Sequence, residues 1–243
     1  MLLGLISDLH SNLPSLKKAY QLFDELGVDE VLCAGDVVGY YARPLEVIDL
    51  LRERCNHVVM GNHDAISVSD DFQQEIRYFN DMARQALVWT RKTLRKSDEH
   101  WDYIASLPMM KHVKVGGMKV LLVHSTPDPD PEEWVYFTYH NISDQDVELT
   151  NWLNTFDADL IMIGHTHVPF IFQTDEKTPR IVLNPGSTGQ PRDSKPAGSF
   201  MTLDTNTREV EHVRYKFSIE KVCKQLKQEN LPDYLCQRLF MGL

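Results

Sequence analysis

The sequence predicts an α/β fold in which helices pack on layers of β-sheet. Short apolar runs alternate with amphipathic stretches through the first 60 residues, which is the βαβ rhythm of a layered sheet. After residue 165, several short strand-like runs follow one another closely. This close spacing predicts a second, mostly antiparallel sheet.

The first 60 residues contain three predicted strands and two predicted helices. The strands cover residues 2–7, 31–34 and 57–60, and the helices cover residues 14–26 and 44–54. Pro14 falls in the first turn of the first helix, where its missing N–H is not needed, and Gly27 ends that helix.

The middle of the chain is predicted to form two helices and a hairpin. Apolar residues between Asp71 and Arg95 recur at helical spacing, which predicts one long amphipathic helix. A shorter helix is expected over residues 99–106. The Gly116–Gly117 pair lies between two strand-like runs and predicts a β-hairpin over residues 111–124.

The remaining part of the chain begins with a proline-containing loop over residues 125–141, followed by a helix over residues 143–156. The later strands are expected over residues 160–164, 169–173, 180–184, 199–203 and 209–215, before a peripheral helical tail over residues 218–243. Of the 243 residues, 42% are hydrophobic and 25% are charged, so residues 1–243 are predicted to form a single domain.

Charge and cysteine content restrict the function and the compartment. The formal net charge of -10 argues against general nucleic-acid binding and against attraction to an anionic membrane. No apolar run approaches the ~20 residues that span a bilayer, and the short N-terminal run reads as a strand, not a signal peptide. The four cysteines have no C-x-x-C spacing, so we expect reduced thiols and a cytoplasmic protein.

Five predicted strands end in residues that can bind metal ions. These segments are Asp8-Leu9-His10, Gly35-Asp36, Gly61-Asn62-His63-Asp64, His124, and Gly164-His165-Thr166-His167. Any one of them alone is more often a turn or a helix cap than a ligand. Because the carboxyl ends of parallel strands meet at one edge of a sheet, the ordered set predicts one shared pocket.

The residue types in this set indicate a particular chemistry. Imidazole nitrogens, carboxylates and one amide oxygen suit Mn, Fe, Zn, Co or Ni better than Mg or Ca. A carboxylate can bridge two such cations about 3.5–4 Å apart, so that a shared water becomes hydroxide and attacks phosphorus in line. The sequence therefore predicts a two-metal phosphoesterase.

The order D-x-H, G-D, G-N-H-D, lone His and G-H-T-H resembles the calcineurin-like metallophosphoesterase superfamily over residues 8–167. More narrowly, GDVVGYYARP and NPGSTGQPRD resemble compact bacterial and archaeal phosphodiesterases, some of which are described as protein phosphatases or diadenosine tetraphosphatases. The resemblance implies a two-sheet β-sandwich flanked by helices, with a dinuclear metal site at the carboxyl ends of its strands.

The resemblance also implies which residues bind each metal ion. One ion would be held by Asp8, His10, Asp36 and His167, and the other by Asp36, Asn62, His124 and His165. Asp36 would bridge the two ions. Manganese is the first expectation, with iron, zinc, nickel or cobalt as alternatives.

His63 has no metal in this scheme and would act on the substrate, either as a general acid or as a donor to the phosphoryl oxygens. Asn62 would also lie against the substrate. Asp64 could orient His63, or a partner could come from elsewhere. The family usually carries a second acidic residue after G-D, whereas residues 37–40 here are Val-Val-Gly-Tyr, which leaves the orienting partner of His63 open.

Two further segments are candidates for substrate contacts. Arg192 could bind a substrate phosphate through its guanidinium or form a surface ion pair, and Asn184, Gly186 and Ser187 could shape the same wall. The aromatic loop residues could stack on a nucleobase or cover a sheet edge or subunit interface; they are Trp134, Tyr136, Phe137 and Tyr139.

The predicted reaction is hydrolysis of a phosphomonoester or phosphodiester, including that of a nucleotide or dinucleoside polyphosphate, by a metal-bridging hydroxide. A protein serine/threonine phosphatase is an alternative within the same class. A different class is a non-catalytic protein-binding scaffold on the same fold, as in a vacuolar sorting subunit that resembles the superfamily but lacks a full ligand set. The complete ligand set here favours the enzyme.

Overall fold

The computed structural model of the protein describes residues 1–128 and 143–243. The four aromatic residues at positions 134, 136, 137 and 139 lie outside the described residues, so their predicted stacking role has no structural test. Within the described ranges, no helix is long and apolar enough to cross a membrane.

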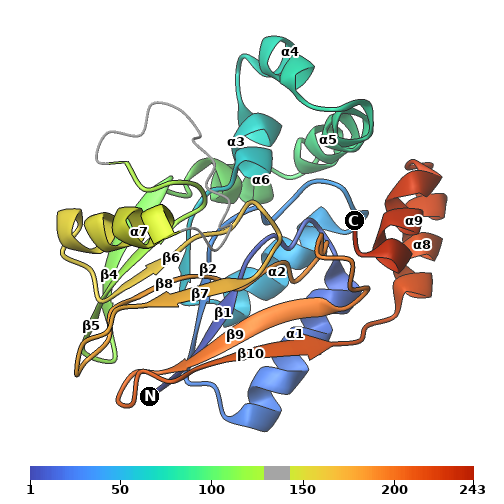
Figure 1. Ribbon diagram of the computed structural model, residues 1–243. Coiled ribbons are helices and arrows are strands. Elements are labelled where there is room, and N and C mark those ends of the chain that lie inside the picture. The colour runs from blue at the N-terminus through green and yellow to red at the C-terminus, as the bar shows by residue number, and fades with distance from the viewer. Residues whose placement is uncertain (129–142) are drawn as a thin grey trace.

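The strands form two five-stranded sheets (Figure 1). The first has the order β10-β9-β1-β2-β3, with β1 Leu2–Ile6, β2 Glu30–Cys33, β3 His57–Val58, β9 Gly198–Asp204 and β10 Val210–Tyr215. The second has the order β4-β5-β6-β8-β7, with β4 Met110–Val115, β5 Met118–Val123, β6 Leu160–Met162, β7 Phe170–Gln173 and β8 Ile181–Asn184. The predicted hairpin is the antiparallel pair β4–β5.

Both sheets are mixed. Strands β1, β2 and β3 are parallel, and β9 runs antiparallel to β1 and β10. Strands β5, β6 and β8 are parallel, with antiparallel β4 and β7 at the edges. The prediction that the last four strands form their own antiparallel sheet is therefore wrong. Close spacing in the sequence indicates that strands are present, but it does not indicate which strands pair with one another. Here the buried strand β8 pairs with β6, and the buried strand β9 pairs with β1.

The two sheets pack face to face around an apolar core. Leu3, Leu5 and Leu203 of the first sheet are fully buried in the same cluster as Leu122 and Leu183 of the second. Such interdigitation of two inner faces is the core of a β-sandwich. The predicted two-sheet sandwich is confirmed.

Helices cover both outer faces of this sandwich (Figure 1). The first sheet is covered by α1 Leu13–Leu26 and α2 Pro44–Arg54, whose Leu16 and Val47 pack in one cluster with Ile6. The second sheet is covered by α7 Ser143–Thr155, which buries Leu149 and Leu153 against Leu121. Asn12 caps α1 by accepting a hydrogen bond from Ser15 N at 3.2 Å.

A group of short helices follows β3 and lies over one end of the sandwich (Figure 1). They are α3 Asn62–Val68, α4 Phe72–Glu75, the 3-10 helix η1 Ile76–Tyr78, α5 Asp81–Leu94 and α6 Asp98–Ala105. The single helix predicted over residues 71–95 is wrong. Phe79 is extended, and the Asn80 side chain accepts from Ala83 N at 3.0 Å, so a new helix starts there.

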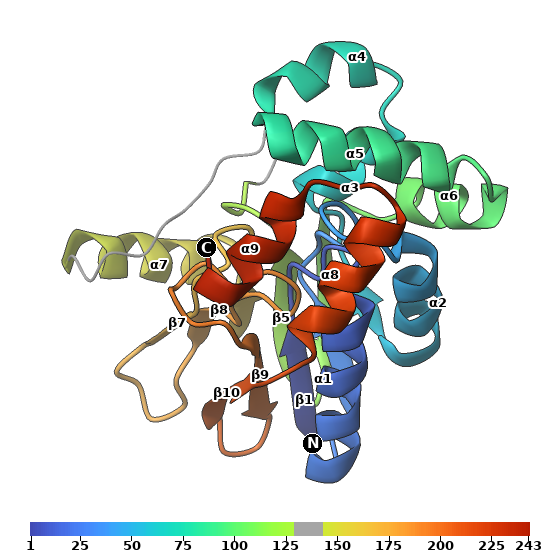
Figure 2. The ribbon, with the colours of Figure 1, turned by 90° about the vertical axis from the view of Figure 1, so that its right-hand side faces the viewer.

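The C-terminal tail forms α8 Ile219–Gln228 and α9 Asp233–Met241, which lie beside α5 (Figure 2). Leu226, Leu235 and Leu239 are buried in a cluster that also contains Tyr41 and Ala86. The tail was expected to be peripheral, yet its apolar face is packed on the segment that follows β2.

A disulfide joins Cys223 of α8 to Cys236 of α9. The expectation of reduced thiols is therefore wrong for this pair, whereas Cys33 and Cys55 are free. The two helices form a hairpin that brings the cysteine Cα atoms to 5.1 Å, within the range that a disulfide requires. Their separation of 13 residues in sequence gives no sign of this proximity.

Leu203→Ala is expected to lower the free energy of unfolding by about 2–5 kcal/mol, because it removes a fully buried side chain between two sheets that cannot collapse onto the cavity. Leu26→Ala is the matched control, since Leu26 is 45% exposed and its loss should cost less than about 1 kcal/mol. Urea unfolding of both variants measures this, and equal losses would contradict the assigned core.

Candidate metal centre and active site

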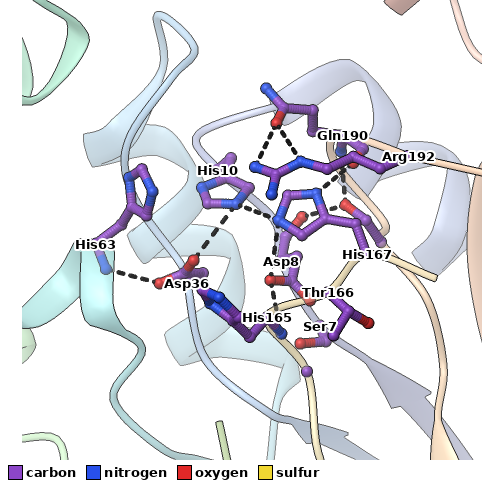
Figure 3. A network of polar contacts seen from close by, with 12 residues as sticks. Ser7, Asp8, His10, Asp36, His63, His165, Thr166, His167, Gln190 and Arg192 are labelled. Atoms are coloured by element: carbon purple, nitrogen blue, oxygen red, sulfur yellow. Dashed lines mark hydrogen bonds and ion pairs between the residues drawn. The ribbon is translucent and has the colours of Figure 1, made fainter. Parts of the chain in front are cut away.

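The site is built where strands of both sheets end. Asp8 follows β1, Asp36 follows β2 and His124 follows β5, and all three side chains are buried. The loops after β1 and β2 are joined by hydrogen bonds from Asp8 N to Gly35 O at 3.0 Å and from His10 N to Asp36 O at 2.9 Å. These two bonds hold the loops side by side at one edge, and Figure 3 shows the Asp8, His10 and Asp36 side chains that they carry.

Backbone strain is concentrated at this edge. Five residues of the predicted ligand set have left-handed φ angles; they are Asp8 (54°), His10 (47°), Asp36 (52°), His165 (67°) and His167 (60°). Such a conformation is unfavourable for residues with a side chain and is retained where surrounding structure enforces it. The turns direct these side chains into one pocket instead of letting them alternate across a sheet.

The first group of candidate ligands comprises Asp8, His10, Asp36 and His167, whose ligand atoms lie within 4.8 Å of one another. His10 Nε2 is 3.1 Å from His167 Nε2 and 3.4 Å from Asp36 Oδ2. His167 Nε2 is 3.2 Å from Asp8 Oδ1. Figure 3 shows these side chains pointing toward one another.

The second group comprises Asp36, Asn62, His124 and His165. Asp36 Oδ2 is 3.4 Å from His124 Nε2, and Asn62 Oδ1 lies 3.2 Å from His124 Nε2 and 3.0 Å from His165 Nδ1. The same Asp36 oxygen is also 3.4 Å from His10 Nε2. The structure therefore brings together all seven predicted residues in two groups that share Asp36.

Hydrogen bonds to backbone carbonyls orient three of these imidazoles. Nδ1 of His10 donates to Val38 O at 3.1 Å, that of His124 donates to Ala34 O at 2.6 Å, and that of His167 donates to Gln190 O. A carbonyl can only accept, so each Nδ1 carries the hydrogen and each Nε2 turns inward. Burial lowers the pKa of His10 and of His167 well below the usual value, so their facing Nε2 atoms are both lone-pair acceptors.

The carboxylates of the site also need a cation. Asp8 Oδ2 is buried and has no hydrogen-bond partner in the described part of the chain, and burial raises the pKa of Asp8 to about 7. Burial alone would raise the pKa of Asp36 too, but the histidines around it, His124 first, lower it well below the usual range. Burial opposes a charge on His124, yet Asp36 raises its pKa to about 9.

The residues of both groups fit a metal ion. Two facing imidazole lone pairs, an unpartnered carboxylate oxygen and a buried carboxylate shared by two groups are unfavourable unless positive charge lies between them. The donor set of nitrogen and oxygen suits divalent first-row cations. Metal binding at such a site competes with protons for the same nitrogen and oxygen atoms.

His63 lies beside this cluster. Its backbone N–H donates to Asp36 Oδ1 at 2.8 Å, and its ring packs against Tyr40 at 4.6 Å and edge-on to Phe79 at 5.2 Å between centroids. Burial lowers the pKa of His63 to about 4, and its Nδ1 has no hydrogen-bond partner among the described residues. Gly39, with a φ of 100°, leaves room for it, since a Cβ there would lie 2.6 Å from His63 Nδ1.

Asp64 is placed differently from the expected orienting role. Its two carboxylate oxygens accept hydrogen bonds from the backbone N–H groups of Val37, Val38 and Gly61 at 2.9–3.1 Å. Burial, with the nearby Asp36 charge, raises the pKa of Asp64 to about 7. Asp64 therefore joins the loop after β2 to the start of α3 through hydrogen bonds. The His63 ring is held instead by packing against the rings of Tyr40 and Phe79.

Arg192 faces the site in a network of polar contacts (Figure 3). Its Nε and Nη2 donate to Gln190 Oε1 at 3.2 and 2.9 Å, and Nη2 also donates to Tyr40 Oη at 3.2 Å. Gln190 Nε2 in turn donates to Tyr41 Oη at 3.1 Å. The guanidinium is thus fixed at the pocket, and it forms no ion pair with the acidic residues of positions 1–128 and 143–243.

The remaining residues proposed for this wall support the ligand loops instead. Asn184 Nδ2 donates to Gly164 O at 2.7 Å, and Ser187 Oγ donates to Asp8 O at 2.8 Å. Gly186 has a φ of 75° and lies against Ser199. These contacts stabilise the turns that carry the candidate metal ligands.

A cavity of about 300 Å³ opens onto the cluster. Its lining comprises Asp36, Tyr40, Asn62, His63, Tyr78, Phe79, Asn80, His165, His167 and Arg192. Sequence reasoning missed four of these, namely Tyr40 and residues 78–80. Tyr40 belongs to the GDVVGYYARP segment, whose resemblance to the family is a signal for it. Residues 78–80 fall inside the helix predicted over residues 71–95, and nothing in their sequence points to the site.

A two-sheet sandwich with a buried Asp, His and Asn cluster at its strand ends defines the class of metal-binding hydrolases. A model of the calcineurin-like phosphoesterase superfamily domain matches residues 1–208. The chain belongs to this superfamily, and it is a metallophosphoesterase, a hydrolase of phosphoric ester bonds.

Three relatives are similar over nearly their full length. An uncharacterized protein of Methanocaldococcus jannaschii is 31% identical, with 99% of this chain and 98% of that protein aligned. A metallophosphoesterase from Sphaerobacter thermophilus is 30% identical with a TM-score of 0.80, covering 100% of both chains. A hypothetical protein from Pyrococcus horikoshii OT3 shares the fold, with a TM-score of 0.84, 20% identity, and 100% and 98% coverage.

Asp36→Asn is expected to lower the amount of divalent metal that the purified protein retains, because it removes the carboxylate oxygen that both groups share. The matched control is Asp102→Asn, which changes an exposed aspartate on α6. Atomic emission analysis after dialysis against manganese measures the metal content. Equal retention in the two variants would contradict the role of Asp36.

Proposed function

We propose that the protein hydrolyses small phosphomonoesters or phosphodiesters at a dinuclear centre. The seven residues Asp8, His10, Asp36, Asn62, His124, His165 and His167 would hold two divalent transition-metal ions, with manganese as the first choice. The observation that carries this proposal is the position of Asp36 Oδ2, 3.4 Å from His10 Nε2 and 3.4 Å from His124 Nε2. A single carboxylate oxygen between two ligand groups is the arrangement of a bridging ligand.

When bound, the ions would supply a hydroxide nucleophile near neutral pH and neutralise charge on the phosphoryl oxygens. The chain's own groups would position the substrate. His63 would donate a hydrogen bond from its ring to the leaving-group or phosphoryl oxygen, and Asn62 would contact the same group. Arg192 would bind a phosphate oxygen, with Gln190 and Tyr40 fixing its guanidinium.

The cavity and the charge favour a small substrate. A volume of about 300 Å³ is at the lower end for small-molecule pockets, and a net charge of -10 disfavours a nucleic-acid polymer. A nucleotide fits these limits, and a dinucleoside polyphosphate would extend out of the cavity. A phosphoprotein is the alternative substrate, whereas a non-catalytic scaffold does not require a buried cluster of costly charged groups.

The compartment expected from the sequence stays a prediction. The free Cys33 thiol agrees with a cytoplasmic protein, whereas a disulfide such as Cys223–Cys236 is rare in reducing compartments. We propose that residues 1–243 act as one catalytic unit, because the tail helices pack on the segment that carries Tyr40.

Four substrates distinguish these functions: p-nitrophenyl phosphate, its bis-ester, a dinucleoside polyphosphate and a phosphopeptide, each assayed with manganese. We expect hydrolysis of at least one small ester and at least a 100-fold lower rate in Asp36→Asn. Asp102→Asn should match the wild type. Hydrolysis of the phosphopeptide alone would support the protein phosphatase, and no hydrolysis of any substrate by the metal-loaded protein would support the scaffold.

Gly39→Ala tests the placement of His63. The new Cβ would lie 2.6 Å from His63 Nδ1, so we expect the imidazole to move and kcat to fall by about 10- to 100-fold. Gly117→Ala is the control, because Gly117 also has a positive φ (81°) but a Cβ there meets nothing within 4 Å. Metal content should stay unchanged in both variants. Equal kcat values in the two variants would argue against a role for the His63 ring.

A further inference from the structure

The cavity over the metal cluster has a lining of two chemical kinds. Arg192 and the Tyr40 hydroxyl provide a cation and a polar group. Tyr78, the last residue of η1, and Phe79, in the turn that follows it, provide aromatic surface. The cationic part suits phosphate, whereas the aromatic part offers a surface for another portion of the substrate.

Tyr78 is the most exposed of the large hydrophobic side chains in the described part of the chain, at 91%. Its neighbours in sequence are anchored. Ile76 is buried in a cluster with Phe72 and Leu87, and Phe79 packs on that cluster and edge-on to His63. The turn is therefore held on both sides, and the Tyr78 ring is presented at the cavity without contributing to the core.

A short contact chain links this aromatic surface to the reaction centre. The Phe79 ring is 5.2 Å from the His63 ring, and His63 N is 2.8 Å from Asp36 Oδ1. A molecule whose phosphate lies against His63 and Arg192 would therefore have its adjoining group beside residues 78–79. An exposed tyrosine favours a flat partner, because stacked rings exclude water from both faces.

We propose that Tyr78, supported by Phe79, is the binding surface for the base of a nucleotide substrate. The substrate class is then a phosphoric ester of a nucleoside, with its phosphate between the metal cluster and Arg192 and its base stacked on Tyr78. This inference rests on the proposed hydrolysis of small phosphoric esters. The inference adds the identity of the group attached to the phosphate, a nucleoside, which the hydrolysis of an ester does not by itself specify.

Two probes that differ only in the base test the proposal. Adenosine 5′-monophosphate and ribose 5-phosphate are compared as competitive inhibitors of p-nitrophenyl ester hydrolysis. In the wild type, the inhibition constant should be about 10-fold lower for adenosine 5′-monophosphate, the scale of one stacking contact. Tyr78→Ala should raise the inhibition constant of adenosine 5′-monophosphate to that of ribose 5-phosphate, and the inhibition constant of ribose 5-phosphate should not change. Tyr78→Phe should give the same two constants as the wild type.

Tyr234→Ala is the matched control, because Tyr234 is 40% exposed on α9 and does not line the cavity. It should leave both inhibition constants unchanged. Calorimetric titration with adenosine, which has no phosphate, provides a measurement independent of hydrolysis. Binding is expected in the wild type and should be lost in Tyr78→Ala. Unfolding by urea should be unaffected in Tyr78→Ala, since the side chain is exposed.

Equal inhibition constants for adenosine 5′-monophosphate and ribose 5-phosphate in the wild type would overturn the inference. So would a Tyr78→Ala variant that changes the two inhibition constants by the same factor. Either result, obtained with an enzyme that hydrolyses phosphoric esters, would leave the proposed function intact. Failure of the metal-loaded protein to hydrolyse any ester would instead overturn the proposed function.

Discussion

The structure depends on keeping two carboxylates, Asp8 and Asp36, inside the protein at the ends of neighbouring parallel strands. Burial penalises both charges: the surrounding imidazoles outweigh that penalty at Asp36, whereas the pKa of Asp8 stays raised to about 7. Three of those imidazoles have their Nδ1 atoms committed to backbone carbonyls. Their inward-facing nitrogens and the two carboxylates therefore form a site with a net demand for cations.

The backbone around this site adopts conformations that are unfavourable in free energy. Left-handed φ angles recur at the ligand positions, and Asp64 is buried so that its oxygens can accept from Val37, Val38 and Gly61. A buried carboxylate used to join two loops is costly unless several hydrogen bonds stabilise it. The superfamily's G-N-H-D sequence thus combines a candidate ligand, a candidate substrate contact and a structural carboxylate within one turn.

The C-terminal hairpin supports the candidate site from outside the part of the chain that matches the superfamily domain, which ends at residue 208. Its apolar face packs on Tyr41, and the Arg238 guanidinium lies 5.7 Å from the Tyr40 ring centroid. Gly242 O accepts from Ser194 N at 2.9 Å, two residues after Arg192. The wall that presents Arg192 and Tyr40 is therefore supported by residues outside the shared domain.

The sequence by itself determined the superfamily and the sandwich through its ordered motifs. It also predicted that the seven residues cluster, because each lies just after an apolar run and strand ends of a layered sheet converge. Only the tertiary structure decided which sheet each late strand joins, where the helix over residues 71–95 breaks, and that Cys223 meets Cys236. It also decided that Asp64 binds backbone and that Tyr78 faces the cavity. Those outcomes depend on contacts between segments remote in sequence, whereas local periodicity reports only which face of an element is apolar.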